Sequence, residues 1–321
     1  MTEAERQQRF LVALNFGMVY VLWGSTYLAI RIVVEHIPPA VMGAARFLLG
    51  GAIMLAWCAV SGRPLKLTRL DLRRVATIGV LLLIGGNVCV AWAEKTVPSG
   101  LTALIVAIVP IWVAIIETFI LKGERLLRRG ILGLLLGVVG LVTLLWPKLS
   151  AGPIDRGILF GAGILMFASL SWATGSILSR RWNLKVDPFA ATGWEMLIAG
   201  AVSMVIALAL GDFHRVVWTP RGLGAIAYLI TAGSLFGLTA YIWLLNHVPT
   251  AKVATYAYVN PIVAVFLGWL ILHEQVDRYI LAGAIVIVGS VWLVNTSKVA
   301  KPVEAGKQTA PEIAACEGVA D

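Results

Sequence analysis

Charge and cysteine are both scarce in this chain, and each scarcity excludes a class of protein. Only 13% of the 321 residues are charged, 59% are hydrophobic, and the mean hydropathy of +0.87 is far from that of a soluble domain. The three cysteines, Cys58, Cys89 and Cys316, have neither the pairing of a disulfide framework nor the spacing of zinc ligands. We therefore expect no disulfide, no metal and no cofactor.

Catalytic motifs are lacking as well. The sequence contains no H-E-x-x-H motif and no Walker loop, and its four histidines fall at predicted helix ends without an evident nucleophile or metal partner. The loops between apolar segments are short, which leaves no room for a separate soluble catalytic domain. The sequence therefore gives no support to an enzyme.

Long apolar runs make up most of what is present. Cut at charged residues, Pro and Gly, they give about ten segments of roughly 20 residues, the length that crosses a hydrocarbon core. The predicted spans are 12–34, 39–60, 74–93, 99–121, 130–146, 157–179, 188–210, 222–246, 251–272 and 279–296. The first lacks a small-residue cleavage pattern, so we expect it to be retained rather than removed as a signal peptide. The chain is predicted to be an all-α integral membrane protein.

One pattern of residues occurs twice. Trp23-Gly24-Ser25-Thr26, with Arg31, Pro39 and Gly51, returns 149 positions later as Trp172-Ala173-Thr174-Gly175, with Arg180, Pro188 and Gly200. Because each copy holds an odd number of spans, the second enters the bilayer from the opposite side, as in many secondary transporters with a site at mid-depth. We predict a cytoplasmic N-terminal tail (1–10), two inverted five-helix repeats (11–147 and 148–296) and a disordered cytoplasmic tail (297–321).

The formal charge of +9 takes its meaning from where the basic residues lie. With the N-terminus inside, eighteen Lys and Arg fall in cytoplasmic segments and only six in the opposite loops. The positive-inside bias then places both termini in the cytoplasm of a multi-pass protein of the cell (inner) membrane, which we expect to be bacterial. The basic excess is a topology signal, so we expect membrane lipid and a small-molecule substrate as partners and no nucleic acid.

Four residues inside the spans are unusual enough to be candidates for a substrate site. Pro110 and Pro261 interrupt matching spans, where each ring frees a carbonyl that must face protein or a watery cavity. Arg46 and Glu195 occupy the same repeat position near mid-depth, where an unpaired charge costs about 2.5–3.5 kcal/mol. They could form a buried salt bridge that fixes the packing of the repeats, or act in gating or recognition of substrate charge. Proton coupling through Glu195 is the weaker alternative.

Aromatic and polar side chains complete the set of substrate-binding or gating candidates. They are Trp23, Thr26, Tyr27, Asn87, Trp92, Trp172, Thr174, Tyr241, Tyr256, Tyr258 and Asn260. Each also has a structural interpretation, because hydroxyl groups in membrane helices commonly bond their own backbone or mediate packing.

Several short segments occur in a fixed order and spacing: W-G-S-T at 23–26, R-F at 46–47, Pro110 followed by L-K-G-E-R at 121–125, and A-K-V-A-T-Y at 251–256 running through Asn260-Pro261 to Gly268-Trp269 and Glu274. Together they resemble the EamA-like family of the drug/metabolite transporter superfamily. The resemblance implies ten helices, of which one to four and six to nine surround a central path while five and ten lie aside. It also implies export or import of amino acids, metabolites or drugs by alternating access; we expect export, and leave a proton or another coupling ion open.

A passive channel or facilitator for a small solute is the alternative function. Asn260-Pro261 superficially resembles a pore motif, but it occurs once, lacks the Ala that usually follows, and no filter sequence accompanies it. The sequence therefore favours a secondary transporter of a small polar or amphipathic metabolite, and leaves the solute, the direction and the oligomeric state open.

Overall fold

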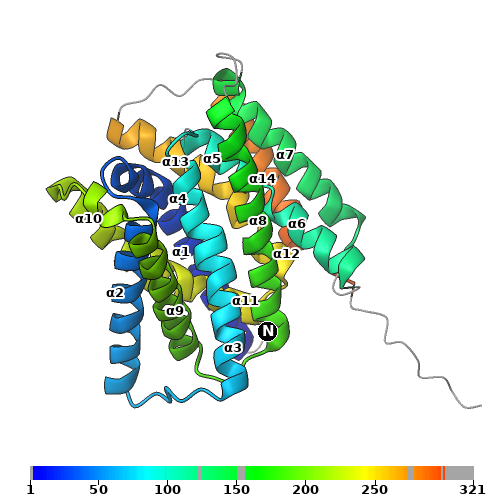
Figure 1. The fold of residues 1–321 in the computed structure, drawn as a ribbon. Helices are drawn as coiled ribbons and strands as arrows, with labels where there is room; N and C mark the ends of the chain where they lie inside the picture. The colour runs from blue at the N-terminus through cyan, green and yellow to red at the C-terminus, as the bar shows by residue number, and fades with distance from the viewer. Residues whose placement is uncertain are drawn as a thin grey trace, which may run out of the picture.

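Helices make up nearly all of the computed structural model, which describes residues 3–97, 99–121, 125–149, 156–272, 278–297 and 299–300. Seven helical segments in those ranges are long and apolar enough to cross a membrane: 3–34, 39–60, 69–93, 156–182, 188–209, 220–247 and 278–296. Three further apolar segments, 99–120, 128–149 and 250–272, complete the ten predicted spans. The chain is an all-α integral membrane protein (Figure 1).

Several spans are built from more than one helical element. The first repeat contains α1 (Glu3–Val34), α2 (Pro39–Val60), α3 (Arg69–Gly79) with the π-helical η1 (Val80–Val88) and α4 (Cys89–Ala93), α5 (Ser99–Val106) with α6 (Val109–Ile115) and η2 (Ile116–Ile120), and α7 (Arg128–Leu149). The second contains α8 (Arg156–Trp182), α9 (Pro188–Ala209), α10 (Pro220–Tyr228) with the π-helical η4 (Leu229–Leu238) and α11 (Thr239–His247), α12 (Thr250–Val253) with α13 (Tyr256–Leu272), and α14 (Arg278–Thr296).

The ends of the chain differ in part from the prediction. Helix α1 begins at Glu3, so most of the predicted N-terminal tail continues the first helix, with acidic residues in its first turn as the helix dipole favours. The predicted tail 297–321 lies outside the described residues, apart from 297 and 299–300. A short strand there, β2 (Val299–Ala300), pairs antiparallel with β1 (Arg125–Leu126) before α7. One further 3-10 turn, η3 (Asp212–Arg215), follows α9.

The repeat pattern is visible in how α2 and α9 begin. Pro39 and Pro188 each stand at the start of their helix, where proline costs no hydrogen bond and its fixed φ suits the first turn. Asp187 caps α9, because its Oδ1 accepts hydrogen bonds from the amides of Phe189 (3.0 Å) and Ala190 (3.1 Å). Equivalent sequence positions therefore start equivalent spans.

Helices α2 and α9 touch each other through glycines in a reciprocal contact. A Cβ on Gly51 would lie 2.7 Å from the backbone nitrogen of Leu197, and a Cβ on Gly200 would lie 2.5 Å from that of Leu48. Because Leu48 contacts Gly200 while Gly51 contacts Leu197, the two equivalent helices run antiparallel about a pseudo-two-fold axis. The two repeats are therefore inverted, as predicted.

Helices α7 and α14 form the same kind of pair at the opposite edge of the molecule (Figure 1). A Cβ on Gly140 would lie 3.0 Å from the Ile287 amide nitrogen, and one on Gly283 would lie 2.6 Å from that of Leu144. Small residues permit such close approach between membrane helices, where lipid provides no hydrophobic drive for association. Spans five and ten thus pack beside the bundle that the other eight form.

The fourth and ninth spans are both interrupted, but at different distances from their equivalent prolines. The fourth span breaks at 107–108, directly before α6 with Pro110 in its first turn. The ninth span breaks at 254–255, and Pro261 lies inside α13. At that break the hydroxyl of Thr255 donates to the Lys252 carbonyl (2.7 Å), an alternative to the helical bond. The prediction that Pro261 makes the interruption was therefore wrong.

Gly51→Ala tests the reciprocal glycine contact. Its new Cβ would meet the backbone of α9, which cannot turn aside as a flexible side chain does, so we expect the free energy of unfolding to fall by about 1–3 kcal/mol. Gly163→Ala is the control, because a Cβ there meets nothing within 4 Å. Thermal unfolding of the purified proteins in one detergent measures both. Equal loss in the two variants would contradict the close contact of α2 with α9.

Candidate functional site

A cavity between the two repeats is the candidate functional site. It has about 60 Å³ of space measured to the centres of water-sized spheres, several times the roughly 10–15 Å³ that one water requires. Its lining comes from spans one to four, six, eight and nine, and from neither α7 nor α14. The lining residues are Trp23, Thr26, Tyr27, Ile30, Arg46, Leu83, Gly86, Asn87, Val90, Val106, Ala168, Ser169, Trp172, Gly233, Ser234, Leu238, Tyr256 and Asn260.

Eight of the residues predicted from the sequence meet in this lining. They are Trp23, Thr26, Tyr27, Arg46, Asn87, Trp172, Tyr256 and Asn260. They come from five different spans, so the fold and not sequence proximity brings them together.

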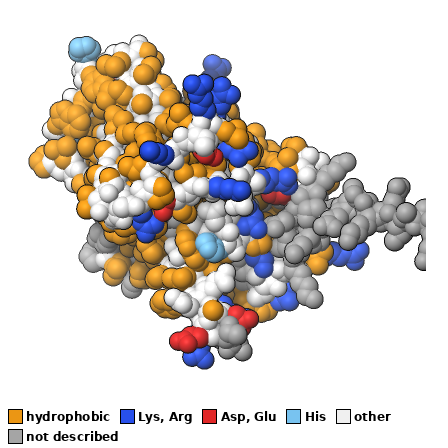
Figure 2. Space-filling model, turned by 90° about the horizontal axis from the view of Figure 1, so that it is seen from below, with side chains coloured by type: hydrophobic (Ala, Val, Ile, Leu, Met, Phe, Trp, Pro, Cys, Tyr) orange, Lys and Arg blue, Asp and Glu red, His pale blue; other side chains and the backbone are white. Residues whose placement is uncertain are grey.

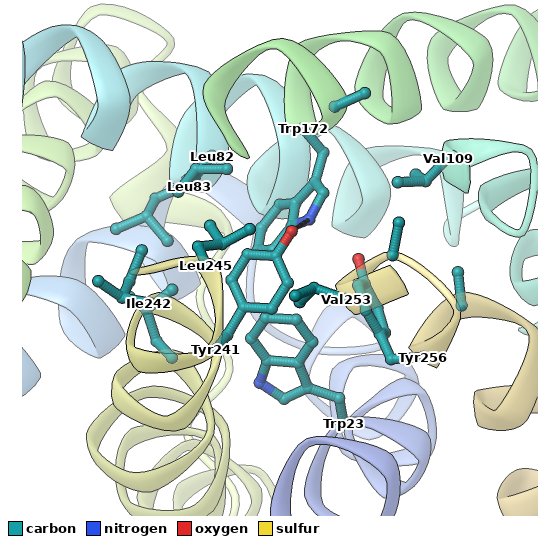
Figure 3. Close-up of a cluster of buried hydrophobic side chains, with 14 of the residues drawn as sticks. Trp23, Leu82, Leu83, Val109, Trp172, Tyr241, Ile242, Leu245, Val253 and Tyr256 are labelled. Carbon is teal, nitrogen blue, oxygen red and sulfur yellow. Dashed lines mark hydrogen bonds between the residues drawn. The ribbon is translucent and has the colours of Figure 1, made fainter. Parts of the chain in front are cut away.

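Four aromatic rings, Trp23, Trp172, Tyr241 and Tyr256, form a contiguous layer against the cavity (Figure 3). The ring centroid of Trp23 lies 5.3 Å from that of Trp172, 4.8 Å from that of Tyr241 and 5.0 Å from that of Tyr256. Trp23 is the lining residue of α1 nearest the N-terminus. The aromatic layer therefore closes the cavity toward the N-terminal half of α1.

Hydrogen bonds hold the aromatic layer in place. The indole Nε1 of Trp172 donates to the Tyr241 hydroxyl at 3.1 Å, and that hydroxyl also bonds Ser176 Oγ at 2.6 Å. The indole Nε1 of Trp23 donates to the carbonyl of Gly233 at 3.0 Å. Buried indole and phenol groups need such partners, so the layer has a defined geometry and is not merely an apolar plug.

The two π-helical segments supply matching walls. Segments η1 and η4 lie in equivalent spans, and their glycines receive the two equivalent tryptophans: a Cβ on Gly86 would lie 2.6 Å from the Trp172 ring, and one on Gly237 would lie 2.4 Å from the Trp23 ring. π-helical turns in membrane and soluble proteins occur preferentially at functional sites. Sequence periodicity did not reveal them, although the glycines signalled close packing.

Arg46 is the charged group of the cavity, and its side chain is only 3% exposed. Its Nε donates to Ser234 Oγ at 2.8 Å, and its Nη1 donates to Asn87 Oδ1 at 3.0 Å. Both acceptors are neutral and come from the two π-helical segments. A Cβ on Gly233 would lie 2.7 Å from Nη2 of Arg46, so only glycine at 233 leaves space for the guanidinium where it lies.

Glu195 does not pair with Arg46, contrary to one prediction. Glu195 is 1% exposed, its Oε2 has no hydrogen-bond partner, and its backbone packs against Gly79 of α3. No ion pair joins the two residues within the part of the chain that the structure describes. The inverted symmetry makes their positions equivalent but does not make them adjacent. Arg46 bonds Asn87 of its own repeat and Ser234 of the other, whereas Glu195 packs against Gly79 of the first repeat.

Two other candidates have structural partners. Tyr258 donates its hydroxyl to the Leu134 carbonyl at 3.2 Å and packs its ring on Gly137, which joins α13 to α7. Thr174 donates to the Leu170 carbonyl of its own helix at 2.8 Å. Neither lines the cavity.

The remaining candidates also lie outside the lining. Trp92 borders a separate small pocket with Lys95, Asp212 and Arg215. Pro110 and Pro261 are buried without facing the cavity, and Tyr241 stands behind its wall as part of the aromatic layer. The prolines therefore shape the spans at most, whereas Tyr241 supports residues that do line the site.

Glu94 is the ionisable residue that sequence analysis missed. It directly follows the third span, is 0% exposed, and neither of its carboxylate oxygens has a hydrogen-bond partner. Arg31 donates to the backbone carbonyl of Glu94 and pairs with Glu35 at 3.7 Å instead. Glu94 interacts electrostatically with Tyr27, a lining residue. The sequence did contain a signal for Glu94: it follows Asn87 by seven residues, a spacing that places both on the same face of a helix.

The chemistry of the cavity is that of a binding site. It offers a guanidinium donor at Arg46, an unpartnered buried acceptor at Asn260 Oδ1, and aromatic faces. Within the described ranges, no group of three His, Cys, Asp or Glu side chains could hold a metal ion. The arrangement is suited to enclosing a small amphipathic molecule.

Comparison with known proteins agrees with this architecture. Residues 12–146 and 159–296 each match the model of the EamA-like transporter family. The chain is 37% identical over 291 residues to the uncharacterized inner membrane transporter YedA of Escherichia coli strain K12, covering 89% of this chain and 92% of that protein. It is 24% identical over 282 residues to the uncharacterized transporter YoaV of Bacillus subtilis strain 168, covering 88% and 96%.

A solved structure shares the fold. A crystal structure of a protein 21% identical in sequence superposes with a TM-score of 0.73, covering 88% of this chain and 95% of that chain. The likeness therefore covers most of the chain.

Glu94→Gln tests the buried carboxyl. Burial raises the pKa of Glu94 well above its ordinary value of 4.5, and Arg31 lowers it to a lesser extent. The folded state therefore binds the proton of the Glu94 carboxyl more tightly than the unfolded chain does. The free energy of unfolding that this protonated carboxyl contributes is lost as pH rises through the raised pKa. We expect Glu94→Gln to melt higher than the wild type at alkaline pH, with the gain shrinking toward pH 4.5.

The control for that measurement is Glu35→Gln, which changes a solvent-exposed carboxylate on the neighbouring loop. It should retain the wild-type dependence of melting temperature on pH. A pH profile that Glu94→Gln leaves unaltered would show that the Glu94 carboxyl does not titrate in the folded protein as its burial requires.

Proposed function

The chain belongs to the EamA-like transporter family, and we propose that it is a secondary permease that moves a small polar or amphipathic metabolite by alternating access. One observation carries the proposal: a cavity between inverted repeats is enclosed by spans from both, and an aromatic layer closes one end. We propose export as the direction of transport. A channel would need a continuous wet path, whereas this cavity ends at packed rings.

The aromatic layer is proposed to act as the gate on the side of the N-terminus. Trp23 and Trp172 are equivalent residues of the two repeats, so rocking one repeat against the other separates them. On the same side, Arg180 donates to the carbonyls of Leu245 (2.9 Å) and Val248 (2.8 Å), and Arg181 pairs with Glu117 at 2.8 Å. All of these contacts are non-covalent and can re-form in each transport cycle.

The distribution of basic residues supports cytoplasmic termini. Seen from below, Lys and Arg side chains gather on the face that carries the connections between α2 and α3 and between α8 and α9 (Figure 2). Arg63 on that face bonds Asp187 at 2.7 Å and lies over the rings of Trp57 and Phe189. The positive-inside bias assigns this face to the cytoplasm.

Cysteine labelling tests that orientation. In a variant with the native cysteines replaced, Lys66→Cys lies in the α2–α3 connection and Val217→Cys in the α9–α10 connection, and both positions are exposed. We expect an impermeant maleimide added to intact cells to label position 217 and spare 66, with both labelled after lysis. Labelling of both in intact cells, or of 66 alone, would refute the proposed topology.

Solute counterflow tests the permease itself. Proteoliposomes loaded with a small-molecule extract of bacterial cells should exchange at least one component for its isotope-labelled form, with saturation. Gly233→Ala should reduce the rate several-fold, because its Cβ would lie 2.7 Å from Arg46 Nη2 and 3.2 Å from Thr26 Cγ2, inside the cavity. Gly224→Ala, on the same span with nothing within 4 Å, should exchange at the wild-type rate. Unsaturable flux without exchange would indicate a channel.

A further inference from the structure

The cavity holds a positive charge that the protein does not neutralise. Arg46 is buried at the wall, and none of the ion pairs among the described residues includes it. A central unpaired guanidinium is expensive in a membrane protein and marks a site where charge is used. Resting on the proposed function, we infer that the solute supplies the missing charge: the permease carries a small organic anion whose carboxylate binds Arg46.

The geometry prepares Arg46 for an external ligand. Ser234 and Asn87 fix two of its three nitrogens at 2.8 Å and 3.0 Å, one from each π-helical segment. The third nitrogen, Nη2, has no hydrogen-bond partner in the described structure and adjoins the gap that Gly233 leaves. A guanidinium held in this way has already lost its rotamer freedom, so a carboxylate gains a charge-assisted bond without that ordering cost.

Neither nearby acid takes the place of that ligand. Glu195 packs against α3 and makes no ion pair with Arg46. Glu94 lies about two helical turns beyond Asn87, behind Tyr27, and both of its carboxylate oxygens are without a hydrogen-bond partner. The guanidinium and the two carboxylates are thus kept apart, which leaves the positive charge available to the cavity.

The rest of the lining indicates the body of the solute. The faces of Trp23, Trp172 and Tyr256 offer apolar aromatic surface beside the guanidinium. Asn260 Oδ1 is buried without a partner and can accept a hydrogen bond from a hydroxyl or ammonium of the same molecule. A carboxylate with an apolar or aromatic body can bind the guanidinium and pack on the aromatic faces at the same time, whereas a cation would be repelled by the guanidinium.

Ligand-induced stabilisation provides the first test. The purified wild type is melted with 3-phenylpropionate, 3-phenyllactate and phenylalanine, each compared with its own amide, and with 3-phenylpropylamine as the cation. We expect at least one carboxylate to bind about tenfold or more tightly than its amide, since a hydrogen bond to a charged group is worth that much. If no carboxylate in the panel stabilises the protein more than its amide does, the inference is overturned.

Two kinds of variant locate the effect at Arg46. Arg46→Gln should abolish the preference for carboxylate over amide, and Arg46→Lys should retain only part of it because the planar fork is lost. Asn87→Asp places a counter-ion on Nη1 without changing shape, so it should melt no lower than wild type while losing the preference. Asn246→Asp adds the same charge at an exposed position and should behave as wild type. A preserved preference in Asn87→Asp contradicts the inference even if Arg46→Gln fails to fold.

Counterflow separates this inference from the proposed function. Exchange of carboxylates that amides do not inhibit supports both. Exchange restricted to neutral or cationic solutes leaves the permease standing and overturns the anion site. Absence of any exchange, with carboxylates still stabilising the wild type through Arg46, overturns the permease and leaves an anion-binding site.

Discussion

The close antiparallel contact of α2 with α9 is the constraint on which the rest of the structure depends. Lipid gives membrane helices no hydrophobic reason to associate, so backbone approach at small residues must supply the energy. Gly51 and Gly200 allow that approach in both directions. With α7 and α14 packed in the same manner at the opposite edge, the spans between them are held at fixed separations. The cavity is the space that this frame leaves between interrupted and π-helical segments.

The helix pairs α2/α9 and α7/α14 are arranged symmetrically, but the residues that line the cavity between the repeats are not. Trp23 and Trp172 meet across the axis and rest on equivalent glycines, so both repeats contribute equally to the proposed gate. At the equivalent charged positions one repeat carries Arg46 and the other Glu195, and only Arg46 faces the cavity. Duplication therefore accounts for the symmetric scaffold, while divergence at one equivalent pair gives the cavity its charge.

The sequence predicted the spans well because twenty-residue apolar runs are dictated by membrane thickness rather than by tertiary contacts. It predicted the inverted repeat from a few residues, and eight cavity residues from their type and depth. It did not predict η1 and η4, because a wide helical turn depends on what packs into it, here Trp172 and Trp23. It also placed the ninth-span interruption at Pro261, whereas the hydroxyl of Thr255 competes for the backbone earlier.

Contacts across repeats were the least predictable part. Shared repeat position suggested a salt bridge between Arg46 and Glu195 as one of two interpretations, but equivalence under a two-fold axis implies proximity only for residues beside that axis. Tyr258 looked like a cavity residue by depth, yet it turns toward α7 and bonds Leu134. Glu94 was not among the candidates, because its burial comes from tertiary packing, which includes the contact of Arg31 in α1 with its carbonyl. The depth of a residue along a span does not predict the direction in which its side chain points.

The missing salt bridge has a thermodynamic consequence for transport. A ligand shifts a conformational equilibrium only by the difference between its affinities for the two states. If Glu195 neutralised Arg46 in the empty protein, an anionic solute would have to displace that carboxylate and would gain little net free energy. Because Ser234 and Asn87 orient the guanidinium without neutralising it, binding energy remains for the solute. The stability that this unpaired charge costs is offset by the glycine contacts of the frame, which lie outside the cavity.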